Sequence, residues 1–279
     1  MIHPALSSGN VAVVTGGASG IGFAAAERFA AMGLKVALAD LPGERLDAAA
    51  HALTGAGGKA LAVPTDVSSR DDLRRLETTV LDRFGQIHVL MNNAGVQPGS
   101  SLFDGVAAWE QILAVNLWGP IHGVQIFVPG MIAHGQPGLV INTGSKQGIT
   151  TPPGDPAYNV SKAGVKVLTE ALAHELRSVP GCKLSAHLLI PGFVFTPLTA
   201  KGRAEKPAAA WTPEQTVDFM VQSLGRGDFY ILCPDNDVPR QLDERRILWA
   251  AQDIIDNRPP LSRWHPDWAE RFKAWIQEA

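Results

Sequence analysis

Short runs of apolar, often β-branched residues alternate along most of the chain with longer alanine-rich stretches of helical character. Strands that alternate with helices predict right-handed βαβ units and a parallel sheet covered on both faces. The runs are continuously apolar, which is typical of strands buried on both faces. The predicted strands are Val11–Thr15, Lys35–Ala39, Ala60–Val63, His88–Met91, Leu139–Asn142, Leu184–Ile190 and Phe229–Leu232.

Seven such strands fit one α/β domain with a doubly wound parallel sheet of the Rossmann type, which we expect over residues 1–236. Within it, residues 196–213 lack periodicity and are predicted to form a mobile lid or a substrate-binding loop. Residues 237–279 are predicted to be a helical C-terminal extension, with helices at Asp237–Asn257 and His265–Gln277. Four of the seven tryptophans fall there. The extension either covers an active-site mouth, of its own or a neighbouring subunit, or docks on the sheet edge.

The composition narrows the class of protein. With 279 residues, 46% of them hydrophobic and 18% charged, the chain is long and apolar enough for one large core. A net charge of −3 provides no broad cationic surface, so nucleic acid is not an expected partner. We expect a cytoplasmic protein without a membrane span, because we find neither a signal sequence nor a long apolar run. Cys182 and Cys233 are expected to be reduced thiols, and the histidines lack metal-ligand spacing, so no metal site is predicted.

A glycine-rich turn follows the first predicted strand and leads into a helix. Glycines let the backbone approach a pyrophosphate, and the helix N-terminus supplies free N–H groups and a positive dipole end. Asp40 ends the second strand eighteen residues after Gly22, where a carboxylate accepts from both ribose hydroxyls. Its charge would repel a 2′-phosphate, so NAD is expected. Arg45 keeps NADP as the alternative cofactor, and a helix cap remains the structural alternative for Asp40. The turn residues expected to contact the cofactor are Gly16, Ser19, Gly20, Ile21 and Gly22.

Tyr158 and Lys162 are separated by four residues in a predicted helix, Ala157–Leu176, so they share one helix face. A nearby ammonium favours the phenolate, and we expect it to lower the tyrosine pKa from about 10 toward neutrality. Such a tyrosine serves as a general acid and base for an alcohol. Taken alone, the two residues are better explained as a solvated surface pair, which is common by chance on helices. Ser145 lies thirteen residues before Tyr158, beyond the fifth strand, where its hydroxyl would stabilise charge on a substrate oxygen.

Taken together, the chain from about Val11 to Leu232 resembles the short-chain dehydrogenase/reductase superfamily, in its single-domain branch. The resemblance rests on Thr15-Gly16-x-x-x-Gly20-Ile21-Gly22, on Asn92-Asn93-Ala94-Gly95, and on Ser145 with Tyr158-x-x-x-Lys162. It implies a catalytic tetrad of Asn116, Ser145, Tyr158 and Lys162, in which Asn116 fixes a water that links Lys162 to solvent. It also implies association through the helix at 157–176 into a homodimer or homotetramer. Four residues of this helix lie either at that interface or against the sheet of their own subunit, namely Val165, Leu168, Leu172 and Leu176. Further cofactor contacts implied by the resemblance are Asp66, Val67, Asn93, Ala94, Gly95, Tyr158, Lys162, Pro191, Gly192, Val194 and Thr196.

The expected activity is therefore NAD-dependent interconversion of a secondary alcohol and its ketone. The alternatives are an NADP-dependent ketone reductase and, in another class, a non-catalytic NAD-sensing or scaffold protein. Lys146 and Gln147 either present a cation and an amide to a polar substrate or lie in a solvated loop. The apolar residues that either line the substrate pocket or pack in the core are Phe193, Phe195, Leu198, Trp211 and Ile149. The aromatic tail with Asn257-Arg258-Pro259-Pro260 is similar to dehydrogenases that oxidise lignin-derived aryl-ether alcohols, which suggests a bulky or aromatic substrate.

Overall fold

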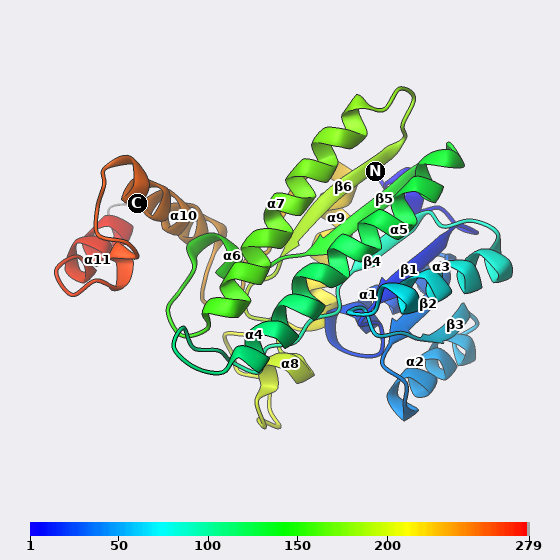
Figure 1. The fold of residues 1–279 in the computed structure, drawn as a ribbon, viewed down its shortest axis with the longest axis horizontal. Coiled ribbons are helices and arrows are strands. Elements are labelled where there is room, and N and C mark those ends of the chain that lie inside the picture. The colour runs from blue at the N-terminus through cyan, green and yellow to red at the C-terminus, as the bar shows by residue number, and fades with distance from the viewer. Residues whose placement is uncertain (278–279) are drawn as a thin grey trace.

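The computed structural model describes residues 1–277, and in this range seven strands form one parallel sheet in the order β3-β2-β1-β4-β5-β6-β7 (Figure 1). The predicted doubly wound α/β fold is confirmed, with each strand end within one residue of its expected position. The predicted extension runs to residue 279, and its last two residues lie outside the described range. The strands are β1 (Val11–Thr15), β2 (Lys35–Asp40), β3 (Lys59–Pro64), β4 (Val89–Asn92), β5 (Gly138–Thr143), β6 (Leu184–Ile190) and β7 (Tyr230–Leu232).

Helices cover both faces of the sheet and enclose two apolar cores (Figure 1). Side chains of a strand point alternately to the two faces, so Ala12 and Val14 of β1 belong to one core, and Val11 and Val13 to the other. The first core includes residues of α1, α2 and α9, and the second includes residues of α3, α5 and α7. The helices of the main body are α1 (Gly20–Ala31), α2 (Glu44–Gly55), α3 (Arg70–Phe84), α4 (Val106–Leu113), α5 (Gly119–Ala133), α6 (Gln147–Thr150), α7 (Pro156–Ser178), α8 (Pro197–Ala200) and α9 (Pro213–Arg226), with short turns η1 (Pro4–Leu6) and η2 (Ala114–Trp118).

The strand order reverses direction between β1 and β4. Because all seven strands of the described range run parallel, their carboxyl ends meet at one edge of the sheet. In folds of this kind, ligands bind outside the carboxyl ends at the point of reversal. The glycine-rich turn after β1, the loop after β4 and the turn after β5 therefore converge on a single site.

One helical run, Val106–Ala133, is long and apolar enough to cross a membrane by length and composition. The expectation that no segment of the chain reaches that threshold is therefore wrong. Polar residues such as Glu110 and Asn116 interrupt the run, so it does not stand out as one apolar stretch in the sequence. In the fold, α5 packs against α3, β4 and β5, and α4 packs against α7. The run is a core helix of this domain.

The C-terminal extension stands apart from the sheet at one end of the molecule (Figure 1). It consists of α10 (Arg240–Ile255), η3 (Ser262–Trp264) and α11 (Ala269–Gln277), and α10 packs against α6 of the main body. The buried Trp249 makes ring contacts with Trp268, Phe272 and Trp275, with centroids 5.3–6.3 Å apart. The tryptophans thus form a small core within the extension itself.

The segment 196–213 is more ordered than its sequence pattern indicates. Thr196 caps α8 through a reciprocal pair of hydrogen bonds with Thr199. Near the other end of the segment, Trp211 pairs with Val194 in an isolated bridge, and its N–H donates to the carbonyl of Phe193 at 2.9 Å. Short-range capping and a single bridge leave little periodicity in a sequence, which is why the helix was not foreseen.

Candidate active site

A cavity of about 570 Å³ follows the carboxyl edge of the sheet. It is lined from the glycine-rich turn, the ends of β2 and β3, the loops after β4 and β6, and α7. Its volume lies in the range of ligand-binding clefts. The structure brings most of the predicted site residues into this one cavity, namely Gly16, Ser19, Gly20, Ile21, Asp40, Asp66, Val67, Asn93, Ala94, Gly95, Ser145, Tyr158, Lys162, Pro191, Gly192, Val194 and Thr196.

The glycine-rich turn is packed so tightly that side chains would not fit. A Cβ on Gly22 would lie 2.1 Å from the carbonyl oxygen of Gly16, and one on Gly16, at φ +63°, would lie 2.8 Å from the Cα of Ala94. Gly22 is buried beneath the turn, so it supports the cavity wall and is not part of the lining. The bare backbone at the start of α1 faces the cavity, which is the arrangement that suits a pyrophosphate.

Asp40 ties the glycine-rich turn to the end of β2. One carboxylate oxygen accepts from the N–H of Ala18 at 3.0 Å, and the other accepts from the N–H of Leu41 at 2.8 Å. Gly43 occupies the N-cap position of α2, which removes the interpretation of Asp40 as a helix cap. Arg45 lines the same end of the cavity, although the cofactor contacts predicted from the sequence include Asp40 and not Arg45.

Thr15, Asn93 and Thr143 join the carboxyl ends of β1, β4 and β5. The Thr15 hydroxyl accepts from the N–H of Asn93 at 2.9 Å, and the Asn93 amide donates to the Thr15 carbonyl at 3.2 Å. The Thr143 hydroxyl donates to the Asn93 amide oxygen at 3.3 Å. These bonds fix the Asn-Asn-Ala-Gly loop rigidly to the sheet beside the cavity.

Tyr158 and Lys162 lie on α7, one turn apart, and both side chains are buried. The Lys162 ammonium donates to the Thr143 carbonyl at 2.8 Å and lies 5.6 Å from the Tyr158 ring centroid. The Ser145 hydroxyl accepts from the N–H of Gln147 at 3.1 Å, in the turn after β5. The solvated-pair interpretation is therefore wrong, because the two residues and the serine face one enclosed space.

The expected fall of the Tyr158 pKa toward neutrality is also wrong for this structure. Burial raises the pKa of Tyr158 to about 12, while a hydrogen bond with Ser145 lowers it and the Asp155 carboxylate adds to the rise. Burial lowers the pKa of Lys162 to about 8. Sequence reasoning counted the lysine charge and left out desolvation, which disfavours the charged form of both groups.

Asn116 is fully buried in η2, a single π-helical turn between α4 and α5. Its side-chain oxygen accepts from the N–H of Val96 at 2.8 Å, and its amide donates to the Val96 carbonyl at 2.9 Å. A Cβ on Gly95 would lie 3.5 Å from the Asn116 oxygen and 3.9 Å from the Lys162 ammonium, so both groups flank the same glycine. Asn116 thus holds the loop after β4 beside Lys162. Within the described residues it stands behind the cavity lining.

The predicted substrate residues lie elsewhere: among the residues that the structure describes, Lys146, Gln147, Phe193, Phe195 and Trp211 are outside the cavity lining. Trp211 packs against Phe219 with ring centroids 5.9 Å apart, as a packing residue would. The Lys146 ammonium is held by two carboxylates. Leu198, which is also predicted as a pocket-wall residue, does line the cavity. Sequence reasoning missed the lining residues Gln111 and Thr199. Thr199 falls in the predicted lid segment, which was the available signal.

Comparisons with known proteins agree with this geometry. The model of the short chain dehydrogenase family matches residues 10–207, and the chain belongs to that family, the short-chain dehydrogenase/reductases. A 1-deoxy-11-beta-hydroxypentalenate dehydrogenase from Streptomyces arenae is 33% identical over 270 residues, which are 92% of this chain and 94% of the relative.

Solved structures of the same family carry either dinucleotide. A short chain dehydrogenase/reductase from Burkholderia phymatum in complex with NAD superposes with a TM-score of 0.82 at 30% identity, covering 91% of this chain and 96% of that one. A metagenomic short-chain oxidoreductase in complex with NADP has a TM-score of 0.68 at 32% identity, covering 82% and 98%. The chain is therefore an oxidoreductase that acts on an alcohol or ketone with a nicotinamide dinucleotide.

Proposed function

We propose that the chain is an NAD-preferring oxidoreductase that interconverts a secondary alcohol and its ketone, with Tyr158 as acid and base. The observation that carries the proposal is the position of Asp40 and of Ser145, Tyr158 and Lys162 along one cavity. The bare glycine turn fits the pyrophosphate, and the Asp40 carboxylate fits the hydroxyls of the adenine-side ribose.

Ser145, Tyr158 and Lys162 have different proposed roles in the reaction of the substrate. Ser145 donates a hydrogen bond to the substrate oxygen and stabilises the charge that develops there. The Tyr158 hydroxyl donates a proton to that oxygen in reduction, and the Tyr158 phenolate accepts the proton of the alcohol in oxidation. Lys162 favours the phenolate and would hold the hydroxyls of the nicotinamide ribose. When bound, the dinucleotide supplies the hydride acceptor or donor. An ordered water beside Asn116 and Lys162 completes the proposed proton path to solvent.

Asp40 is the basis of the proposed preference for NAD. Its carboxylate would stand against the second negative charge of a 2′-phosphate, and its two oxygens are already oriented by Ala18 and Leu41. Arg45 lines the same end of the cavity and favours the second candidate, an NADP-dependent ketone reductase. We favour NAD because the carboxylate is anchored by two backbone groups, whereas Arg45 is exposed.

We propose a bulky, largely apolar alcohol, aromatic or polycyclic, as the substrate class. Val96 and Leu198 add apolar surface to the same cavity that Ser145 and Tyr158 line, and Leu198 belongs to the short helix α8. Apolar walls with few polar groups bind such ligands and orient their single reacting oxygen. The Streptomyces relative is named for the dehydrogenation of a pentalenate, which supports an extended carbon skeleton.

We also propose that the protein acts in the cytoplasm as a homodimer or homotetramer. The apolar helix at 106–133 is accounted for by packing within the domain. Of the predicted interface stripe on α7, Val165, Leu172 and Leu176 are buried in their own subunit, whereas Val160 and Val167 of the same helix are 49% and 62% exposed. The proposed contact between subunits therefore uses the outward face of α7.

Initial rates with NAD and with NADP, over a panel of aryl and alicyclic secondary alcohols and their ketones, test the proposal. We expect kcat/KM for NAD to exceed that for NADP by at least about tenfold, since one charge repulsion of about 1.4 kcal/mol is a factor of ten. Asp40→Ser should remove that preference, and Asp47→Asn on the exposed face of α2 should retain it. NADH binding without turnover of any panel member would instead support a sensing or scaffold role.

A further inference from the structure

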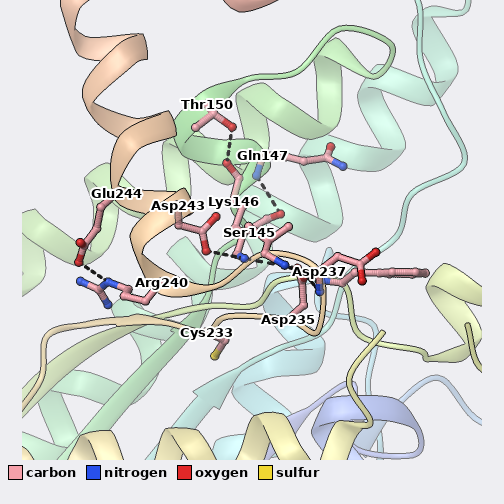
Figure 2. Close-up of polar contacts among 12 residues, drawn as sticks. Ser145, Lys146, Gln147, Thr150, Cys233, Asp235, Asp237, Arg240, Asp243 and Glu244 are labelled. Carbon is pink, nitrogen blue, oxygen red and sulfur yellow. Dashed lines mark hydrogen bonds and ion pairs between the residues drawn. The ribbon is translucent and has the colours of Figure 1, made fainter. Parts of the chain in front are cut away.

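Three charged side chains, each from a different segment, meet where the C-terminal extension contacts the main body (Figure 2). The Lys146 ammonium lies 2.6 Å from a carboxylate oxygen of Asp243 and 3.4 Å from one of Asp235. The three side chains are 17%, 5% and 6% exposed, respectively. Lys146 follows Ser145 directly, Asp235 lies after β7, and Asp243 is on α10 of the C-terminal extension. The cluster therefore joins the extension to the main body.

Asp235 extends the cluster to the loop after β6, which lines the cavity. The oxygen that faces Lys146 also accepts from the N–H of Phe193 at 3.1 Å. A Cβ on Gly192 would lie 2.6 Å from this oxygen and 3.0 Å from the Lys146 ammonium. Gly192 itself lines the cavity, so the cluster stands directly behind its wall.

The other end of the cluster fixes the turn that carries Ser145. The Lys146 carbonyl accepts from the N–H groups of Ile149 and Thr150, at 3.1 Å each, and so begins α6. Within the same turn, the Ser145 hydroxyl accepts from the N–H of Gln147. Because Lys146 is held at its ammonium and at its carbonyl, the direction of the adjacent Ser145 side chain depends on both attachments.

Charged groups of both signs surround the Asp243 carboxylate. Burial raises the pKa of Asp243, while Lys146 and Arg246 oppose the rise and Asp235 adds to it. Arg263, from η3, also faces this carboxylate. A buried ion pair adds little stability compared with apolar packing of the same volume, but it fixes geometry, and losing one partner leaves a buried charge unpaired.

We propose that Asp243 is a positioning residue for the active site: through Lys146 and Asp235 it sets the placement of Ser145 and of the Gly192–Phe193 segment. The C-terminal extension thereby takes part in catalysis without contacting the substrate. This inference rests on the proposed function, because its kinetic effect is expected on hydride transfer between an alcohol and NAD.

The test compares Asp243→Asn with Glu244→Gln in the full chain. Glu244 is the next residue on α10 and forms an exposed pair with Arg240, so it is a matched control for loss of one carboxylate (Figure 2). We expect Asp243→Asn to lower kcat about tenfold or more for the best panel alcohol and to raise the KM for NAD by a smaller factor. The unfolding midpoint should change little, because Lys146 keeps its pair with Asp235. Hydrogen–deuterium exchange without any ligand should speed up at residues 144–150 and 191–196 and stay unchanged at residues 15–22.

Lys146→Met, which keeps the aliphatic stem, should reproduce both effects, and the double variant should be no worse than either single one. The proposal is overturned if Asp243→Asn matches Glu244→Gln in kcat and in exchange. It is also overturned if kcat, NAD affinity and unfolding midpoint all fall together, since that is general destabilisation. If the wild-type chain turns over no alcohol, the proposed function fails, and the exchange rates of the two segments alone decide the positioning role.

Discussion

Tyr158 and Lys162 are both more than nine-tenths buried, and burial favours the neutral form of each. Burial raises the pKa of the tyrosine to about 12 and lowers that of the lysine to about 8. At neutral pH the phenol is therefore protonated and ready to donate, while the ammonium is still mostly charged. These protonation states favour ketone reduction at neutral pH and make the rate of alcohol oxidation dependent on pH.

The pH dependence of the reaction rate follows from the raised pKa of Tyr158 and the lowered pKa of Lys162. Oxidation needs the deprotonated tyrosine, whose fraction grows tenfold per pH unit below its pKa, so kcat/KM for the alcohol should rise steeply between about pH 6 and about pH 8. Above about pH 8 the rise should weaken, because Lys162 loses the charge that favours the phenolate. Steady-state rates in both directions measure this. The kcat/KM for ketone reduction should stay nearly flat over the lower range, and an oxidation rate without pH dependence there would contradict the account.

At the scale of elements, the start of α1 is the feature on which cofactor binding depends. The glycine-rich turn that leads into α1 has Gly16 and Gly20 at φ +63° and +54°, in the left-handed region that favours glycine. Gly22 lies within the first turn of α1 and has no room for a side chain. The glycine-rich turn and the loop after β4 thus pack closely at Gly16 and Gly22, where a side chain would not fit.

Gly22→Ala tests this packing. Its methyl group would meet the Gly16 carbonyl and the Asn93 amide, so we expect the free energy of unfolding to fall by about 1–3 kcal/mol, the usual cost of overpacking. NADH affinity should fall as well, because the turn must shift. Gly55→Ala is the control: this glycine ends α2 and has open space around it, so the free energy of unfolding should change by less than about 1 kcal/mol. Urea unfolding and NADH titration of both variants decide, and equal behaviour would refute the packing argument.

At the scale of the whole molecule, the outward face of α7 is the surface that the proposed assembly needs. Val160 and Val167 are exposed on a helix whose other face is buried against its own sheet. Exposed apolar residues on the helix that also carries Tyr158 would place a subunit contact close to the site. Assembly would then stabilise the catalytic helix.

Light scattering of the purified chain tests the assembly. We expect a mass of two or four times 29.7 kDa for the wild type and a shift toward the monomer for Val167→Glu, because a buried unpaired carboxylate is costly. Leu81→Glu on α3, where the leucine is 39% exposed, should leave the mass unchanged. A wild-type chain that is monomeric at every concentration would contradict the proposal.

The sequence was most informative where one physical signal dominates. Doubly buried strands are recognisable as apolar runs, so the positions of all seven predicted strands and the fold class were foreseen. Gly16, Asp40, Tyr158 and Lys162 were found from their spacing taken together with the strand pattern and Ser145, and the fold brings them to one edge. Features that depend on tertiary contacts were not foreseen. The carboxylates that hold Lys146 are 89 and 97 positions away in the chain, and desolvation of Tyr158 depends on how completely α7 is buried.

The central claim is that the Tyr158 hydroxyl carries the proton for alcohol and ketone interconversion, and Tyr158→Phe measures it most directly. The substitution removes one buried oxygen and keeps the ring, so NADH affinity should stay within about twofold of the wild type. We predict that kcat/KM falls by at least about a hundredfold in both directions, the usual contribution of a general acid and base. A variant that retains full activity while binding NADH normally would contradict the account.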